Sequence, residues 1–96
     1  MDSTSPAPDT AAITVVHSPA CHFCDDARAA LTDLATEFPL TVEFVDCTEP
    51  RGGALIRQHR AGMYPLVLVD RGFFSAGRQP RKKLRAQLSS RFAAVA

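Results

Sequence analysis

The distribution of apolar residues in the first half of the chain predicts a strand, a helix and a second strand. Residues 13–17 are mostly β-branched, and the turn-forming pair Ser18-Pro19 follows them, as expected of a short buried strand. From residue 24 onward, apolar positions recur every three to four residues along one helical face, until Pro39 stops the pattern. Residues 40–46 then largely alternate between apolar and polar positions and favour a second strand.

The second half of the chain predicts a helix followed by a hairpin. Glu49-Pro50 fits the start of a helix that ends near Arg60, although two glycines inside it each cost about 1 kcal/mol relative to alanine. Residues 65–69 are apolar at every position, which is typical of a central strand covered on both faces. The turn residues 70–72 then lead to a short partner strand at 73–75.

A basic helix is predicted to close the chain. Gly77 interrupts the preceding pattern, and Pro80 suits the first turn of a helix. Leu84, Leu88 and Phe92 then fall on one helical face, with Arg and Lys residues between them. The predicted order of elements is therefore β-α-β-α-β-β-α, which is an α/β fold without an internal repeat.

Length and composition indicate one folded domain. The 96 residues are too few for two independent cores, and 46% hydrophobic with 22% charged residues lies within the globular range. Residues 1–11 contain two prolines and no apolar periodicity, so we expect a flexible tail there and the domain at 12–96. The sequence contains no run of about eighteen apolar residues, as a membrane-spanning helix would need, and no recognisable secretory signal. We therefore expect a cytoplasmic protein that does not bind membranes.

The two halves of the chain carry opposite charge, although the net charge is only +1. Residues 1–50 hold nine acids and one base, whereas residues 51–96 hold ten bases and one acid. The basic run at 78–85 has no aromatic residues interleaved with it, as a surface that stacks nucleic-acid bases would need. We therefore expect no nucleic-acid partner and interpret this run as a solvated helix face.

Two of the three cysteines, Cys21 and Cys24, stand in a Cys-x-x-Cys pattern at the predicted strand-to-helix junction. The unpaired N–H groups of a first helical turn favour a thiolate at the leading sulfur, and the thiolate is the reactive form of cysteine. Cys21 is therefore the candidate nucleophile, and Cys24 is the candidate thiol that resolves a mixed disulfide. The isolated Cys47 is more simply a small buried apolar residue, with a third redox thiol as the alternative.

The pattern around the cysteines resembles a known family. Residues 15–27, with Cys21-His22-Phe23-Cys24-Asp25 at their centre, are similar to the active-site strand, loop and helix start of glutaredoxins, particularly the small bacterial glutaredoxin-like proteins of Cys-His-x-Cys type. Residues 63–69 resemble the segment in which that family places a cis-proline, here Tyr64-Pro65, facing the cysteine pair. The resemblance implies a thioredoxin-like three-layer fold. The order of the elements and the right-handedness of β-α-β crossovers predict a mixed sheet of four strands in the order 2-1-3-4, the last strand antiparallel, with helices on both faces.

The resemblance also implies a function. It is that of a thiol–disulfide oxidoreductase that reduces mixed disulfides of proteins or of low-molecular-weight thiols, with Cys21 and Cys24 as catalytic residues. No tightly bound cofactor or metal is implied. Electrons would come from glutathione, another low-molecular-weight thiol or a reductase, and the protein would act as a monomer. The residues implied to contact the substrate are His22, Phe23, Tyr64, Pro65, Gly77 and Arg78.

The segment before the last helix departs from the family pattern. Glutaredoxins usually carry Gly-Gly and an acidic pair there, whereas residues 75–83 retain one glycine and have bases in place of the acids. Such a cationic site would disfavour the ammonium group of glutathione and attract carboxylates or an acidic partner.

Three other interpretations of the cysteine pair remain open. The chain could be a redox-inactive interaction module, since fold does not imply function. It could carry a [2Fe–2S] cluster held by Cys21 of two protomers and a small thiol. It could also bind structural zinc through the pair together with some of the residues His17, His22, Cys47 and His59.

Overall fold

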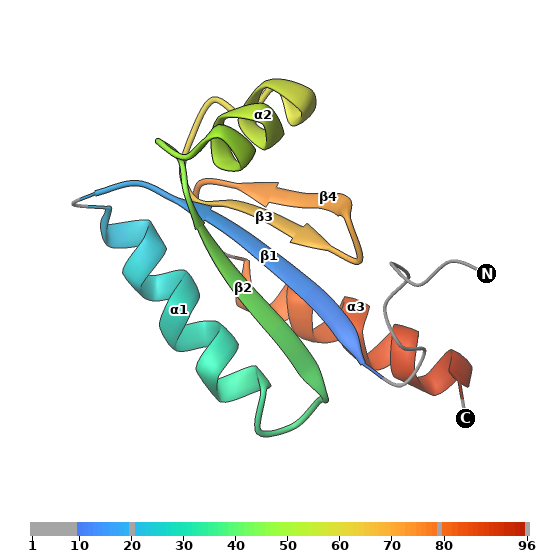
Figure 1. Ribbon diagram of the computed structural model, residues 1–96. Coiled ribbons are helices and arrows are strands. Elements are labelled where there is room, and N and C mark those ends of the chain that lie inside the picture. Colours follow the sequence, from blue (N-terminus) through green and yellow to red (C-terminus); the bar gives the residue numbers. More distant parts are fainter. Residues whose placement is uncertain (1–9, 20, 79, 96) are drawn as a thin grey trace.

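A computed structural model describes residues 10–19, 21–78 and 80–95 of the chain. The predicted tail lies mostly outside the described residues. The elements follow the predicted order (Figure 1): β1 (Ala11–His17), α1 (His22–Leu34), β2 (Leu40–Asp46), α2 (Pro50–His59), β3 (Leu66–Val69), β4 (Gly72–Ala76) and α3 (Arg81–Val95). No helix among the described residues is long and apolar enough to cross a membrane.

The four strands form one mixed sheet in the order β2-β1-β3-β4, as predicted. β1 pairs in parallel with β2 and antiparallel with β3, and β4 pairs antiparallel with β3. The antiparallel direction of β3 relative to β1 was not part of the prediction. In this register Val16 of β1 lies between Val45 and Leu66. The fold is therefore a mixed α/β arrangement with β1 and β3 at its centre, compatible with a thioredoxin-like fold.

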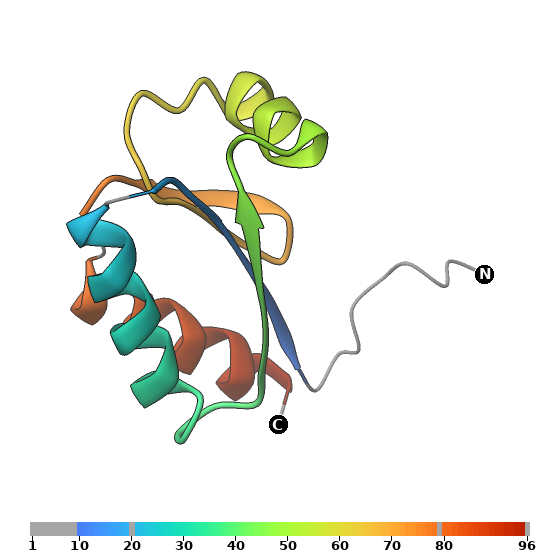
Figure 2. The ribbon, with the colours of Figure 1, turned by 60° about the vertical axis from the view of Figure 1, so that its left-hand side comes forward.

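The two faces of the sheet are covered by different helices. Because successive strand residues point to opposite faces, neighbouring residues of β1 contact different helices. Ile13 and Val15 of β1 pack with the apolar faces of α1 and α3. Val16 instead belongs to a second cluster, against which residues of α2 pack. Figure 2 shows the same division, with α1 and α3 on one side of the sheet and α2 on the other. Leu84 and Leu88 of α3 are fully buried in the larger cluster, and each contributes about 1.5–3 kcal/mol by the transfer of its side chain from water.

The start of β1 and the end of α1 differ from the prediction. β1 begins at Ala11 and not at residue 13; Ala11 is completely buried, and its N–H donates to the carbonyl of Pro39 at 3.0 Å. α1 ends at Leu34, although the apolar periodicity continues to Phe38. The hydroxyl of Thr36 donates to the carbonyl of Asp33 at 2.6 Å and competes with continuation of the helix.

The glycine pair in α2 has a packing role at one of its two positions. A Cβ atom on Gly52 would lie 2.1 Å from the carbonyl oxygen of Asp46, at the end of β2. Only glycine therefore lets the first turn of α2 come this close to the strand backbone. Gly53 lies more openly, because its Cβ would meet the guanidinium of Arg57 at 3.3 Å and no closer atom. The close approach at Gly52 explains why α2 contains glycine, a residue of low helix propensity, at that position.

Candidate functional site

The cysteine pair lies at the start of α1, where the chain leaves the central strand β1. Cys21 is the N-cap residue of the helix, with φ −108° and ψ 108°, and Cys24 lies in its first turn. The two residues form a disulfide, with their Cα atoms 5.2 Å apart. The backbone N–H of Cys24 donates to Sγ of Cys21 at 3.1 Å. The leading sulfur thus takes the place of a capping oxygen, which is a position that stabilises an anion.

The two cysteines are unequally exposed. Cys24 is buried, with 9% of its surface exposed, whereas Cys21 is only partly buried. Between them, His22 and Phe23 are exposed on the first turn, where they can contact a docked substrate. A partner disulfide could therefore reach Cys21 more easily than Cys24.

The segment around Pro65 lies at the same end of the sheet as the cysteines. Val16, near the end of β1, pairs with Leu66, which directly follows Pro65. The Tyr64-Pro65 peptide bond is cis, as predicted. The carbonyl of Pro65 accepts a hydrogen bond from the N–H of Gly77 at 3.0 Å, so two of the predicted substrate residues lie side by side. A direct contact between Pro65 and Cys21 stays a prediction.

Gly77 has a backbone conformation that other residues rarely adopt, and it lies close to the side chain of Met63. Its φ is +100°, and a Cβ atom there would meet Sδ of Met63 at 3.3 Å. Met63 itself is 52% exposed beside this contact. The turn before β3 and the turn after β4 are therefore packed together at the site end of the sheet.

Tyr64 has a partner that the sequence did not indicate. Its hydroxyl and the thiol of Cys47 form a side-chain hydrogen bond, and this bond raises the pKa of Tyr64 above its usual range. Cys47 follows β2 directly, and its N–H donates to the carbonyl of His17 at 2.8 Å. Cys47 is partly buried and packs against the smaller core cluster. Residues this far apart in sequence give no local signal of their contact.

The carboxylate of Asp46, next to Cys47, is held by the following turn. Both the backbone N–H and the hydroxyl of Thr48 donate to its Oδ1, at 2.8 and 2.7 Å. These hydrogen bonds, the backbone one first, lower the pKa of Asp46 below its usual range.

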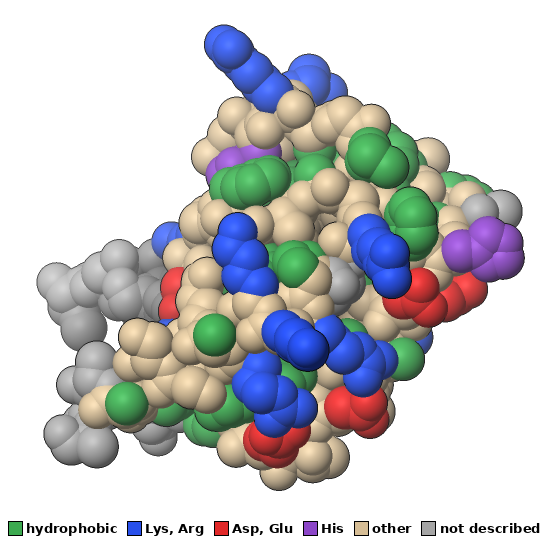
Figure 3. All heavy atoms as spheres, turned by 180° about the vertical axis from the view of Figure 1, so that it is seen from behind, with side chains coloured by type: hydrophobic (Ala, Val, Ile, Leu, Met, Phe, Trp, Pro, Cys, Tyr) green, Lys and Arg blue, Asp and Glu red, His purple; other side chains and the backbone are tan. Residues whose placement is uncertain are grey.

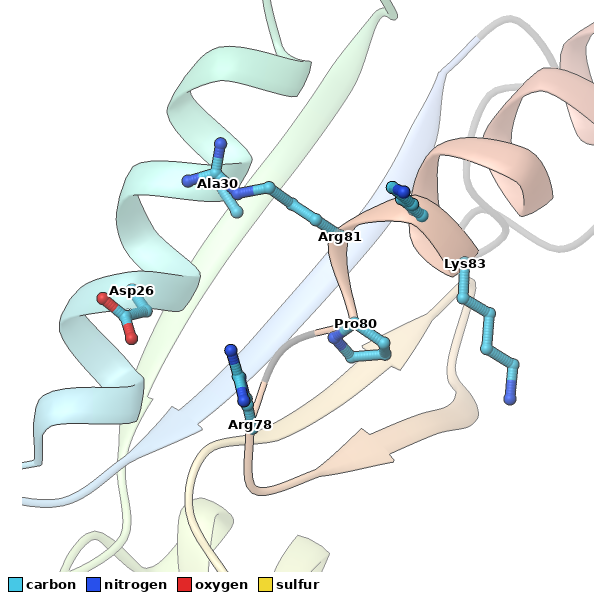
Figure 4. A pocket seen from close by; sticks show the side chains of 7 residues that line it. Asp26, Ala30, Arg78, Pro80, Arg81 and Lys83 are labelled. Carbon is cyan, nitrogen blue, oxygen red and sulfur yellow. The ribbon is translucent and has the colours of Figure 1, made fainter.

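A basic cavity of about 540 Å³ lies between α1 and the start of α3 (Figure 4). Its lining residues come from α1, from the chain just before α3 and from the first turn of α3: Asp26, Ala30, Arg78, Pro80, Arg81, Lys82 and Lys83. The sequence indicated Arg78 as a substrate residue, whereas it suggested only a solvated helix face for the three bases that follow Pro80. The charge run was the available signal, but its position opposite α1 depends on the tertiary fold.

The possible metal ligands are not gathered. Among the described residues, no group of three or more His, Cys, Asp and Glu side chains is placed to hold a metal ion. The described part of the chain therefore contains no assembled zinc site of the kind weighed above.

Comparisons with known proteins add no family assignment. No protein-family model matches the chain, and the search of curated proteins found no match. The function must therefore be argued from the site itself.

Proposed function

We propose that this protein is a thiol–disulfide oxidoreductase with a thioredoxin-like fold of the glutaredoxin type. The observation that carries the proposal is the position of Cys21 at the N-cap of a 13-residue helix, with its sulfur accepting the N–H of Cys24. An N-terminal helix position favours the thiolate over the thiol, and only the thiolate attacks disulfides. The unequal burial of the two cysteines also supports distinct roles for them.

The reaction begins from the reduced pair. The Cys21 thiolate attacks one sulfur of a substrate disulfide, forms a mixed disulfide with it and expels the other sulfur as a thiolate. Cys24, one helical turn away, then gives up its proton and attacks Sγ of Cys21. This second step releases the remaining substrate half as a thiolate and forms the Cys21–Cys24 disulfide. Two electrons pass from the pair to the substrate, whose two thiolates take up protons from water.

The pair must then be reduced again by an external donor. A low-molecular-weight thiol such as glutathione can do this by the reverse exchange, with two thiol molecules leaving as one disulfide, and a reductase could supply the same two electrons. The exposed residues His22 and Phe23, and the Tyr64, Pro65 and Gly77 region, are the proposed contacts for the substrate chain.

The proposal is tested by reduction of a mixed disulfide under two electron sources. The reduced protein is given a peptide disulfide, with glutathione and its reductase as donor in one assay and thioredoxin reductase in the other. Turnover with either donor supports the proposal and identifies the donor. Cys21→Ser should abolish the reaction, whereas the matched variant Cys47→Ser should retain it. If Cys47→Ser lost activity while Cys21→Ser kept it, or if the wild-type chain turned over with neither donor nor with dithiothreitol, the proposal would be wrong.

A further inference from the structure

The cavity beside the cysteine pair is strongly basic. Four of its lining residues are bases, Arg78, Arg81, Lys82 and Lys83, and only Asp26 is acidic. Figure 3 shows Lys and Arg side chains gathered on the side of the molecule that is turned away in Figure 1. An open concave surface with this charge attracts anions and raises their local concentration.

Most of this charge is not neutralised by the chain itself. Arg81 pairs with Asp33 at 3.1 Å. Within the described part of the chain, no ion pair involves Arg78, Lys82 or Lys83. Lys82 and Lys83 also lie in the first turn of α3, where the helix dipole disfavours cations. These bases therefore do not serve to stabilise the helix that carries them.

The cavity is close to the reactive sulfur along two elements. Asp26 and Ala30, on its α1 side, follow the cysteine pair by about one and two helical turns. On its other side, Arg78 directly follows Gly77, whose N–H donates to the carbonyl of Pro65. A segment bound to Cys21 could thus extend into the cavity.

The directions of the basic side chains favour an extended ligand. In Figure 4 Arg81 reaches toward α1 near Ala30, Arg78 lies between Asp26 and Pro80, and Lys83 points away from α1. One carboxylate could not contact all three groups, because they do not converge on one point. Several carboxylates spaced along a peptide could.

We infer that this basic cavity selects substrates whose disulfide is flanked by an acidic peptide segment. The inference rests on the proposed function and names its substrate class: disulfide-bonded proteins with Asp or Glu near the reacting cysteine. The chemistry is unchanged, since the cavity only orients the segment while Cys21 and Cys24 exchange disulfides with it. Charge attraction of this kind acts mainly on the association rate and is weakened by salt.

The test uses two peptides that differ only in charge. Each contains one cysteine in a mixed disulfide with 2-thiopyridine; one peptide has three Glu near the cysteine, and the other has Gln at these positions. The dithiol form of the protein attacks the peptide sulfur and releases thiopyridone, which is followed by its absorbance. We expect the Glu peptide to react about tenfold faster at low ionic strength and the advantage to disappear at high salt.

The variant Arg78→Gln/Lys83→Gln should lose most of this advantage, measured as the ratio of the rates with the Glu and Gln peptides. The matched variant Arg57→Gln/Arg60→Gln removes two bases at the end of α2, on the opposite face of the sheet, and should keep it. Equal rates for both peptides with wild-type protein, or equal losses in both variants, would overturn the inference while the proposed function stands. No reaction with either peptide would overturn both. Stronger inhibition by a single-stranded oligonucleotide than by the Glu peptide's reduced form would assign the cavity to nucleic acid and also overturn the inference.

Discussion

Replacement of Gly52 by alanine should destabilise the protein, although alanine is the better helix former. The new Cβ would lie 2.1 Å from the carbonyl oxygen of Asp46, 2.9 Å from its carbon and 3.1 Å from Cα of Cys47. All three are backbone atoms, so the helix or the end of β2 must move. Overpacking of this kind costs about 1–3 kcal/mol, or more, and exceeds the roughly 0.5–1 kcal/mol that alanine gains over glycine inside a helix.

Gly53→Ala is the matched control for this prediction. Its Cβ would meet only the flexible end of Arg57 at 3.3 Å and the Cys47 carbonyl at 3.7 Å. We expect it to leave the free energy of unfolding unchanged or to raise it by up to about 1 kcal/mol. Urea unfolding of both variants, followed by far-ultraviolet circular dichroism, measures the difference, which should be about 2 kcal/mol or more. Equal stability of the two variants would refute the close approach of α2 to the end of β2.

Two further predictions concern hydrogen bonds near the site. Cys47→Ala should lower the pKa of Tyr64 toward its ordinary value, because the thiol that bonds to the phenol is lost. Tyr64 is the sole tyrosine and the chain has no tryptophan, so absorbance at alkaline pH follows the ionisation of Tyr64 alone. An unchanged titration midpoint would contradict the contact. Thr48→Ala should raise the pKa of Asp46, because one of the two hydrogen bonds that hold its carboxylate is removed. The folded state holds the pKa of Asp46 below its unfolded value, so the ionised Asp46 stabilises the fold at neutral pH. This stabilisation is lost as the pH falls through the folded pKa, and the loss should be smaller in Thr48→Ala. NMR titration of the Asp46 carboxyl in both proteins measures the shift, and identical pKa values would refute the assignment.

Local sequence patterns predicted the elements well where burial alone determines them. The near-alternation over 40–46 matches β2, and the fully apolar run at 66–69 matches the central strand β3. The sheet order was also anticipated, from the order of the elements and the right-handedness of β-α-β crossovers. The pattern could not show where α1 ends, because Phe38 lies beyond the helix but still packs against the core, with its ring stacked on that of Phe92 at 5.7 Å between centroids.

The candidate site was only partly predictable, for a physical reason. Cys21 and Cys24 are neighbours in sequence, so their spacing and their place before a helix predict their chemistry. The contact between Cys47 and Tyr64 and the basic cavity both join segments that are distant in the chain. A run of charged residues such as 81–83 has the same local pattern whether it faces solvent or lines a cavity. Here the packing of α3 beside α1 places these residues at a cavity.

The central claim is that Cys21 is the reactive thiol, and competitive alkylation tests it most directly. The fully reduced protein is treated with limiting iodoacetamide at neutral pH, and peptide mass spectrometry gives the labelling rate of each of the three cysteines. The same experiment in urea, where the helix N-terminus is absent, is the control and should give similar rates for all three. In the folded protein we predict that Cys21 is labelled first. Cys24 should react more slowly because it is buried, and Cys47 because its thiol is hydrogen-bonded to Tyr64. Labelling of Cys24 as fast as Cys21, or of Cys47 before either, would contradict the account.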